Sequence, residues 1–517
     1  MIRSLTRVLP AAATLAAIAF APARAQRTDE ARTAAYLAAV RERPPLLYAF
    51  LREMPKGGDL HSHLSGAVYA ESFLRWAAED SLCISRRALS VVYGTCTGAE
   101  GDTISGQAAV GDQTLYDQLI DAWSMRNWVP GPVSGHDQFF RTFARFGATD
   151  RRIGDELAEA QARAAGGELS YLELMLTPDG SLATRLGAAV LGDAFAPGRQ
   201  PDFAEARQAL LPRLAPVLDS ARRALTRIAA RRDTVLGCGT GRADAGCRVE
   251  VRWLYQVGRG RAPAQVFAQI LTGFELAQAD PRVVGFNLVM PEDGVVSMRD
   301  FTLQMHMIDY LHALYPRVRV SLHAGELAPG LVPPEGMRFH IRQSVELGHA
   351  SRIGHGVDVM HEDRPDELLR EMARRGVMVE IALTSNDAIL GVRGRDHPLA
   401  AYRRAGVPMA LVTDDQGVAR SEMPREYQKA VQEQGLDYAA LKEMARASLR
   451  HAFVEGAGVW REGRAFTPVP DCAPAAGGWR GSRCAALAAR STRARLQRDL
   501  ELAFLDFEAR WAAMAAP

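Results

Sequence analysis

Eight short apolar runs recur along the chain, and most of the segments between them have the period of a helix. The runs are rich in Val, Ile and Leu, and they cover residues 59–64, 169–176, 249–257, 283–289, 318–323, 351–355, 377–383 and 407–413. Continuous apolar strands that alternate with helices indicate a parallel sheet buried on both faces. Eight such units predict an α/β fold of the (β/α)8, or TIM, barrel type.

Two segments add to a minimal barrel. An insertion of about residues 80–165 separates the first two runs, and a helical tail covers about residues 456–517. A helical segment, residues 26–53, precedes the barrel, which we expect to occupy residues 54–517. Periodicity leaves open whether the insertion is a lid or a homodimer surface.

The first 25 residues have the features of an export signal. Arg3 and Arg7 precede an apolar stretch over residues 8–21, and Ala23-Arg24-Ala25 supplies a small-x-small cleavage pattern. The stretch is too short to span a bilayer comfortably, and no later stretch reaches roughly 18 uncharged apolar residues. We therefore expect residues 1–25 to be removed, and the mature protein to be soluble and either periplasmic or secreted.

The cysteines agree with export. There are six, and they form three pairs of sequence neighbours: Cys83 with Cys96, Cys238 with Cys247, and Cys472 with Cys484. Six cysteines allow many connectivities, so the neighbour pairing is inferred from spacing. An even count in an oxidising compartment favours disulfides, and the absence of any CxxC pair argues against a zinc cluster.

The charge balance excludes one class of partner. The chain has 62 Lys and Arg against 60 Asp and Glu, for a net charge of +2. Residues 1–25 contain three arginines and no acid, so the remainder carries 2 − 3 = −1. A nearly neutral chain without a basic block gives no electrostatic basis for nucleic-acid binding.

Ionisable residues gather where four of the runs end. These clusters are His61-Ser62-His63, His323-Ala324-Gly325-Glu326, Gly354-His355-Gly356 and Thr413-Asp414-Asp415. The C-terminal ends of the strands are where barrels of this type hold their active sites, and His61 and His63 project to one side of a strand. The clusters supply three imidazoles and a carboxylate for a divalent ion such as zinc. They also leave acids and a histidine for proton transfer, so a metal hydrolase is favoured over four unrelated structural roles.

These motifs carry a family resemblance. HSHLSGA at 61–67, SLHAGE at 321–326, RIGHG at 352–356 and TDD at 413–415 resemble, in this order, the adenosine deaminase family of amidohydrolase barrels. Met54-Pro55-Lys56-Gly57-Gly58 is similar to the secreted branch, the adenosine deaminase–related growth factors, as are the export signal and the cysteine-bearing insertion. The resemblance covers about residues 54–455.

The resemblance implies a role for each matching residue. One zinc per chain would be bound by His61, His63, His323 and Asp414. Glu326 would protonate purine N1, His355 would orient and help to deprotonate the zinc-bound water, and Asp414 would also orient that water. Asp415 would hydrogen-bond purine N7, and His63 would also face the substrate.

Two positions depart from the family pattern, and both are expected to line the substrate pocket. The aspartate that contacts the 5′ side of the ribose is replaced by Ser65, and the glycine whose backbone meets purine N3 aligns with Met290. Both lie where the sugar and the far ring edge should sit, so they leave the substrate open. Ser385 and Asn386, at the end of the seventh run, are open to either loop capping or substrate contact.

The sequence is thus interpreted as an exported, zinc-dependent deaminase. It would convert adenosine or 2′-deoxyadenosine, with water, to inosine or deoxyinosine and ammonia. One alternative keeps the barrel and the metal but acts on another amidine or amide, such as adenine, a modified adenosine or a cyclic amide. A second is a secreted, non-catalytic binding or signalling protein, which the complete set of metal and acid residues disfavours.

Overall fold

The computed structural model describes residues 28–98, 101–196, 198, 200–463 and 465–514. The expected export signal, residues 1–25, lies outside the described residues.

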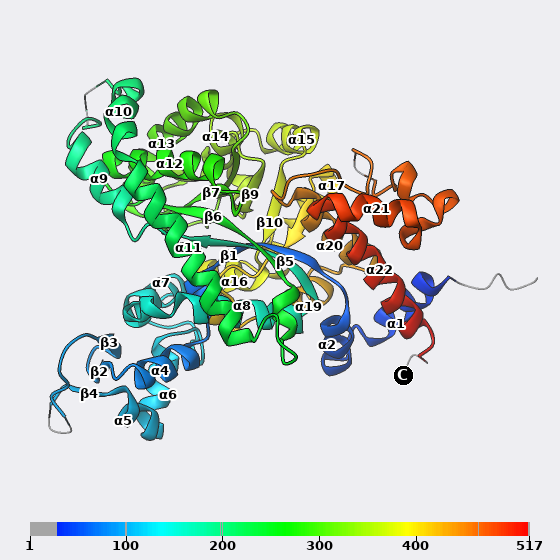
Figure 1. Ribbon diagram of the computed structural model, residues 1–517, viewed down its shortest axis with the longest axis horizontal. Coiled ribbons are helices and arrows are strands. Elements are labelled where there is room, and N and C mark those ends of the chain that lie inside the picture. The colour runs from blue at the N-terminus through cyan, green and yellow to red at the C-terminus, as the bar shows by residue number, and fades with distance from the viewer. Residues whose placement is uncertain (1–27, 99–100, 197, 199, 464, 515–517) are drawn as a thin grey trace, which may run out of the picture.

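The core of the molecule is a (β/α)8 barrel (Figure 1). Its parallel strands neighbour one another in the order β1 (Gly57–His63), β5 (Leu169–Leu176), β6 (Glu250–Gly258), β7 (Val283–Val289), β8 (Arg319–Ala324), β9 (Arg352–His355), β10 (Met378–Ile381) and β11 (Met409–Leu411). A bridge between Ser62 and Asp414 joins the first strand to the segment after the last. Every predicted run overlaps one of these strands, so the predicted fold class is confirmed.

Helices surround the sheet and bury its outer face. They include α8 (Ile153–Gly166), α11 (Ala215–Leu236), α12 (Pro263–Ala279), α13 (Val295–Leu314), α14 (His340–Glu346), α15 (Pro365–Arg375), α17 (Leu399–Ala405) and α20 (Tyr438–His451). The ends of α15 show how the sequence sets these boundaries. Pro365 starts the helix, where its fixed φ suits the first turn, and Gly376 ends it with a φ of +69°.

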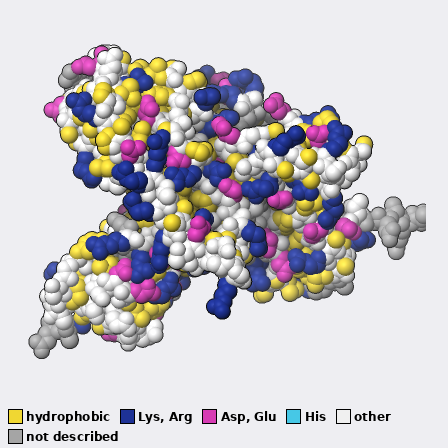
Figure 2. Space-filling view, in the orientation of Figure 1, with side chains coloured by type: hydrophobic (Ala, Val, Ile, Leu, Met, Phe, Trp, Pro, Cys, Tyr) yellow, Lys and Arg dark blue, Asp and Glu magenta, His cyan; other side chains and the backbone are white. Residues whose placement is uncertain are grey.

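The segment after β1 forms a lobe with its own hydrophobic core. It contains α4 (Ala70–Glu79), β2 (Cys83–Ser85), β3 (Ser90–Val92), β4 (Thr103–Ser105), α5 (Gly106–Gly111), α6 (Gln113–Ala122) and α7 (Gly135–Phe146). Phe73, Trp123 and Phe139 are buried in this second core. Ile389 and Val418, which follow β10 and β11, belong to the same cluster and attach the lobe to the barrel. Figure 2 shows a notch between the lobe and the barrel.

The two ends of the described chain pack against each other. The predicted helical segment before the barrel is two helices, α1 (Asp29–Val40) and α2 (Pro44–Glu53). Tyr36 and Phe50 from these helices contact Trp511 of α22 (Thr492–Ala512), with ring centroids 4.7 and 4.8 Å from the indole. α22 also packs beside α20 at the edge of the barrel (Figure 1).

Three disulfides join the cysteines that are neighbours in sequence. They link Cys83 to Cys96, Cys238 to Cys247 and Cys472 to Cys484, as the spacing predicted. Among the described residues, no helix has both the length and the apolar character needed to cross a membrane. Acidic and basic side chains are interspersed over the face seen in Figure 2, in keeping with the balanced charge.

Candidate metal centre

The four predicted ligand side chains meet at the C-terminal end of the barrel. The Nε2 atom of His323 lies 3.0 Å from Nε2 of His61 and 3.2 Å from Nε2 of His63. Asp414 Oδ1 lies 3.5 and 3.4 Å from the Nε2 atoms of His61 and His63. Ligands placed about 2.0–2.1 Å from a tetrahedral metal are roughly 3.3–3.4 Å apart, so these four spacings match those around one ion. The donor atoms of His61, His323, His355 and Asp414 form a second possible group, in which all lie within 4.8 Å of one another.

Hydrogen bonds at Nδ1 orient the imidazole rings of His61 and His323 so that their Nε2 atoms face each other. His61 Nδ1 donates to the carboxylate of Glu380 at 2.7 Å. His323 Nδ1 donates to Asn287 Oδ1 at 2.8 Å, and that oxygen also accepts from the backbone N–H of His323. In the neutral form, which is the form that binds metals, each imidazole has one N–H, so the two Nε2 atoms then face each other without a proton. A cation between them resolves this arrangement.

The remaining ligands have the same chemical character. Asp414 Oδ2 accepts from the hydroxyl of Ser385 at 2.7 Å, whereas its buried Oδ1 has no hydrogen-bond partner within the described chain. Burial lowers the pKa of His63 to about 4, which keeps this ring in the neutral form that binds metals. Three imidazoles and one carboxylate form a donor set that suits zinc. The site is therefore a buried His/Asp cluster able to hold a divalent metal ion.

A buried ion-pair network lies behind His61. The carboxylate of Glu380 accepts from Arg352 Nε at 2.6 Å, and a second group of that guanidinium donates to Glu173 at 2.6 Å. All three side chains are fully buried. Sequence reasoning missed this network, although an acid inside each of two apolar runs was a usable signal.

Glu326 lies beside the ligands on the loop that follows β8. Glu292 fixes this loop, because its carboxylate accepts from the backbone N–H groups of Gly325 at 3.0 Å and Glu326 at 2.8 Å. Burial and the charges of Asp414 and Glu292 raise the pKa of Glu326 to about 8. A carboxyl in this position is protonated at neutral pH and can act as an acid.

His355 ends β9 and faces Glu326. Its Nδ1 lies 3.0 Å from Asn386 Oδ1, which orients the ring, and its buried Nε2 lies 3.6 Å from the Glu326 carboxylate. Burial lowers the pKa of His355, so the ring is available to take a proton. His355 and Asp414 have φ values of +70° and +54°, a strained conformation that concentrates at functional sites.

Two motif glycines make room for functional side chains. A Cβ at Gly354 would lie 2.5 Å from the His61 ring, and a Cβ at Gly66 would lie 1.5 Å from Asp415 Oδ1. Asp415 is buried, and burial together with the charge of Asp414 raises its pKa well above the usual range. The protonated Asp415 carboxyl could therefore donate a hydrogen bond to a ligand.

Comparison with known proteins agrees with this geometry. Residues 214–458 match the family model for adenosine deaminase. This segment of the chain is therefore similar to the adenosine deaminase family. The matched segment contains His323, Glu326, His355 and Asp414, whereas the histidine pair on β1 precedes it.

Proteins with similar sequences include both adenine deaminases and adenosine deaminases. The chain is 27% identical over 408 residues to an adenine deaminase of Sinorhizobium medicae, across 77% of this chain and 94% of that protein. It is 35% identical over 136 residues to an adenosine deaminase of Shewanella loihica, across 26% of this chain and 38% of that protein. A 219-residue match at 26% identity to an adenine deaminase of Rhizobium leguminosarum spans 42% of this chain and 62% of that protein. The last two matches thus span less than two thirds of those relatives.

Solved structures share the barrel at low sequence identity. An amidohydrolase from Burkholderia ambifaria, solved with bound Zn, has a TM-score of 0.51 at 16% identity and covers 95% of this chain and 98% of its own. An adenine deaminase from Arthrobacter aurescens has a TM-score of 0.50 at 16% identity and covers 78% of this chain and 94% of its own. At these identities the likeness is one of fold.

The two departures from the family pattern are more exposed than the predicted ligands. The side chain of Ser65 is exposed just after β1. Met290 is 43% exposed with a φ of +84°, and its carbonyl accepts from Arg259 Nε at 3.2 Å. Arg259 also donates to the backbone carbonyl of His323 at 3.1 Å, so Met290 is linked to the ligand cluster indirectly.

Ser385 and Asn386 have contacts that neither expectation named. Both lie in α16 (Leu383–Leu390), where Ser385 donates to Asp414 and Asn386 orients His355. They therefore support the predicted metal and proton-transfer residues.

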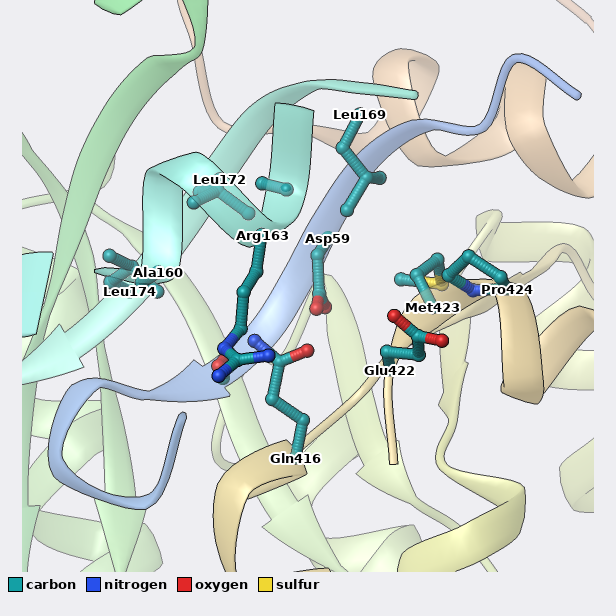
Figure 3. A pocket seen from close by; sticks show the side chains of 12 residues that line it. Asp59, Ala160, Arg163, Leu169, Leu172, Leu174, Gln416, Glu422, Met423 and Pro424 are labelled. Carbon is teal, nitrogen blue, oxygen red and sulfur yellow. The ribbon is translucent and has the colours of Figure 1, made fainter. Parts of the chain in front are cut away.

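Asp59 closes the barrel just behind the ligands. Its carboxylate accepts from the hydroxyl of Thr413 at 2.5 Å, which ties β1 to the segment that ends in Asp414. Figure 3 shows Asp59 beside a small cavity of about 10 Å³ that Arg163, Gln416 and Glu422 also line. Burial raises the pKa of Asp59 to about 7, against the effect of its hydrogen bonds.

Proposed function

We propose that this protein is an exported, zinc-dependent deaminase that converts adenosine or 2′-deoxyadenosine, with water, to inosine or deoxyinosine and ammonia. One observation carries the proposal. The Nε2 atoms of His61 and His63 each lie within 3.5 Å of both His323 Nε2 and the Asp414 carboxylate, beside the buried acid Glu326.

Zinc in this cluster would lower the pKa of water from about 15.7 to about 7 and so supply a nucleophile at neutral pH. The protein's part is to hold and move protons around the purine. Glu326 would give a proton to N1 as C6 is attacked, which relieves the charge that the ring would otherwise carry. His355 would orient the attacking water and accept its proton. His355 would pass that proton to the C6 amino group, which leaves as ammonia, and the remaining hydroxyl proton would return to Glu326 as the C6 carbonyl forms.

Asp415 would fix the ring from its other edge. Purine N7 is an acceptor, so a hydrogen bond to it needs a donor. The raised pKa of Asp415 supports a protonated carboxyl that can donate. Its buried Oδ1 has no partner within the described residues and so is free to make this bond.

Adenine is the second candidate substrate, and Ser65 is the observation that favours it. The family aspartate at this position contacts the ribose side, and the extended match is to an adenine deaminase. The test is kcat/KM of metal-replete enzyme on adenosine, 2′-deoxyadenosine and adenine under one condition. We expect both nucleosides to be preferred. A higher kcat/KM for adenine would contradict the assignment of nucleosides as substrates, but it would still support a deaminase activity.

Export is supported by residues 1–25 and by the three disulfides. The test is N-terminal sequencing and thiol counting of protein from its native host. We expect a mature chain that begins near Gln26 with no titratable thiol. A chain that keeps residues 1–25 and has six free thiols would contradict export.

A further inference from the structure

A polar cavity of about 230 Å³ lies at the opposite end of the barrel from the metal cluster. Its lining includes Arg319, the first residue of β8, and Ser351 and Val377, which directly precede β9 and β10. The predicted ligands lie at the other ends of the strands, so the cavity is separate from the candidate active site.

The lining of this cavity is strongly basic. The positive charge comes from four arginines, because the low pKa of His451 leaves that ring neutral. No Asp or Glu occurs among the described residues that line the cavity, whose basic residue types are Arg319, Arg375, Arg450, Arg493, His349 and His451. An adjoining cavity of about 1170 Å³ shares four of these six and includes Glu443 and Glu462. The larger cavity has six arginines against these two glutamates, so both cavities are basic, but only the smaller one has no acidic residue in its described lining.

Two of these arginines are well placed to receive an anion. Arg493 is held at the wall by the backbone carbonyls of Val454 at 2.6 Å and Ala452 at 3.2 Å, which orient its charge without neutralising it. Arg319 is exposed and makes no ion pair with any residue that the structure describes. A guanidinium that is already ordered loses little entropy when it binds an oxyanion.

The positive charges of the arginines in this cavity also repel one another. Burial and the neighbouring charge of Arg319 lower the pKa of Arg493. Burial, with the charges of Arg352, Arg450 and Arg493, lowers the pKa of His451 to about 3. Repulsion of this kind costs folding free energy, so a purely stabilising role does not explain the cluster.

We propose that this cavity binds a compact oxyanion of the phosphate type, either inorganic phosphate or the phosphoryl group of a small metabolite. Arginine forks match the geometry of phosphate oxygens and bind them through paired hydrogen bonds. The volume is below the roughly 300 Å³ at which pockets for larger organic ligands begin, which favours a small anion. The larger cavity alongside leaves room for the rest of a phosphorylated molecule.

The test is calorimetric titration of the metal-replete protein with inorganic phosphate at constant ionic strength. Arg319→Gln and Arg375→Gln each remove one charge from the cavity. Arg223→Gln, at an exposed position of α11, removes the same charge from elsewhere and is the matched control. We expect one phosphate per chain in the wild type and in the control, and binding at least tenfold weaker in each cavity variant.

Thermal unfolding tests whether a variant loses phosphate binding only because it is misfolded. We expect phosphate to raise the Tm of the wild type and the control but not of Arg319→Gln, which without phosphate should be at least as stable as the wild type. A parallel titration with a sugar phosphate separates the two sources, because tighter binding than inorganic phosphate would identify a phosphorylated metabolite. Non-saturable binding, or equal binding in the wild type and both cavity variants, would overturn the proposal.

Discussion

The buried partner of His61 gives the sharpest structural prediction. Glu380 accepts from His61 Nδ1 with one oxygen, and from Arg352 Nε and the Ser321 hydroxyl with the other. Glu380→Gln keeps the shape but has only one acceptor oxygen. If that oxygen faces Arg352, the amide NH2 faces His61 Nδ1 and moves the imidazole proton to Nε2. A protonated Nε2 cannot bind a metal.

The expected losses of metal affinity and of folding free energy follow from the contacts of Glu380 with His61 and Arg352. Replacing a hydrogen-bond partner behind a metal ligand typically weakens metal affinity by about 10–100-fold, which is about 1.4–2.7 kcal/mol. Breaking a buried ion pair costs about 3–5 kcal/mol of folding free energy. Glu380→Gln is expected to do both, because Glu380 contacts a metal ligand and Arg352 at once.

Glu173→Gln is the matched control, because it removes the other carboxylate of Arg352 without touching a metal ligand. Zinc affinity is measured by chelator competition, and the stability of the metal-free protein by urea unfolding. We expect Glu173→Gln to lose stability but to keep zinc affinity within a few fold of wild type. Equal zinc affinities in wild type and Glu380→Gln, or equal losses of affinity in both variants, would refute this reasoning.

Three further predictions concern other residues. Glu326→Gln should keep the metal, by elemental analysis, and lower kcat by about 10²–10⁴-fold, since only proton donation is lost; near-normal turnover would remove its role as the acid. Ser65→Asp should change KM for adenosine more than KM for adenine if Ser65 faces the ribose, and equal changes would place it elsewhere. Burial lowers the pKa of Lys56 to about 7 from 10.5, so from pH 7 to 10 the unfolded chain binds more protons and stability should rise with pH. Urea unfolding should find a rise of up to about 1.4 kcal/mol per pH unit that Lys56→Met lacks; parallel pH profiles would contradict this.

The barrel was predictable because its signals are local. Each strand appears in the sequence as a continuous apolar run, and each predicted ligand or acid sits at the end of one. Barrel topology then brings the ends of distant strands together, so the predicted ligands meet in space.

The pairing of the supporting residues was not predictable, because the partners lie far apart in the sequence. His61 and Glu380 are 319 residues apart, and nothing near either residue specifies the other. Gln256, whose Oε1 lies 3.1 Å from His63 Nδ1, was visible only as a polar residue inside an apolar run, as were Asn287 and Glu380. The core of the inserted lobe likewise includes Ile389 and Val418, which follow the last two strands of the barrel in the sequence. Periodicity within the insertion does not reveal this contact.

The most direct test of the account is ammonia release by metal-free protein as zinc is added back. The cluster of His61, His63, His323 and Asp414 predicts that activity on adenosine or 2′-deoxyadenosine rises linearly and saturates at one zinc per chain. The product should be inosine or deoxyinosine, formed in equal amount to ammonia. Saturation of the site with zinc and no ammonia from either nucleoside or from adenine would contradict the assignment of this protein as a purine deaminase.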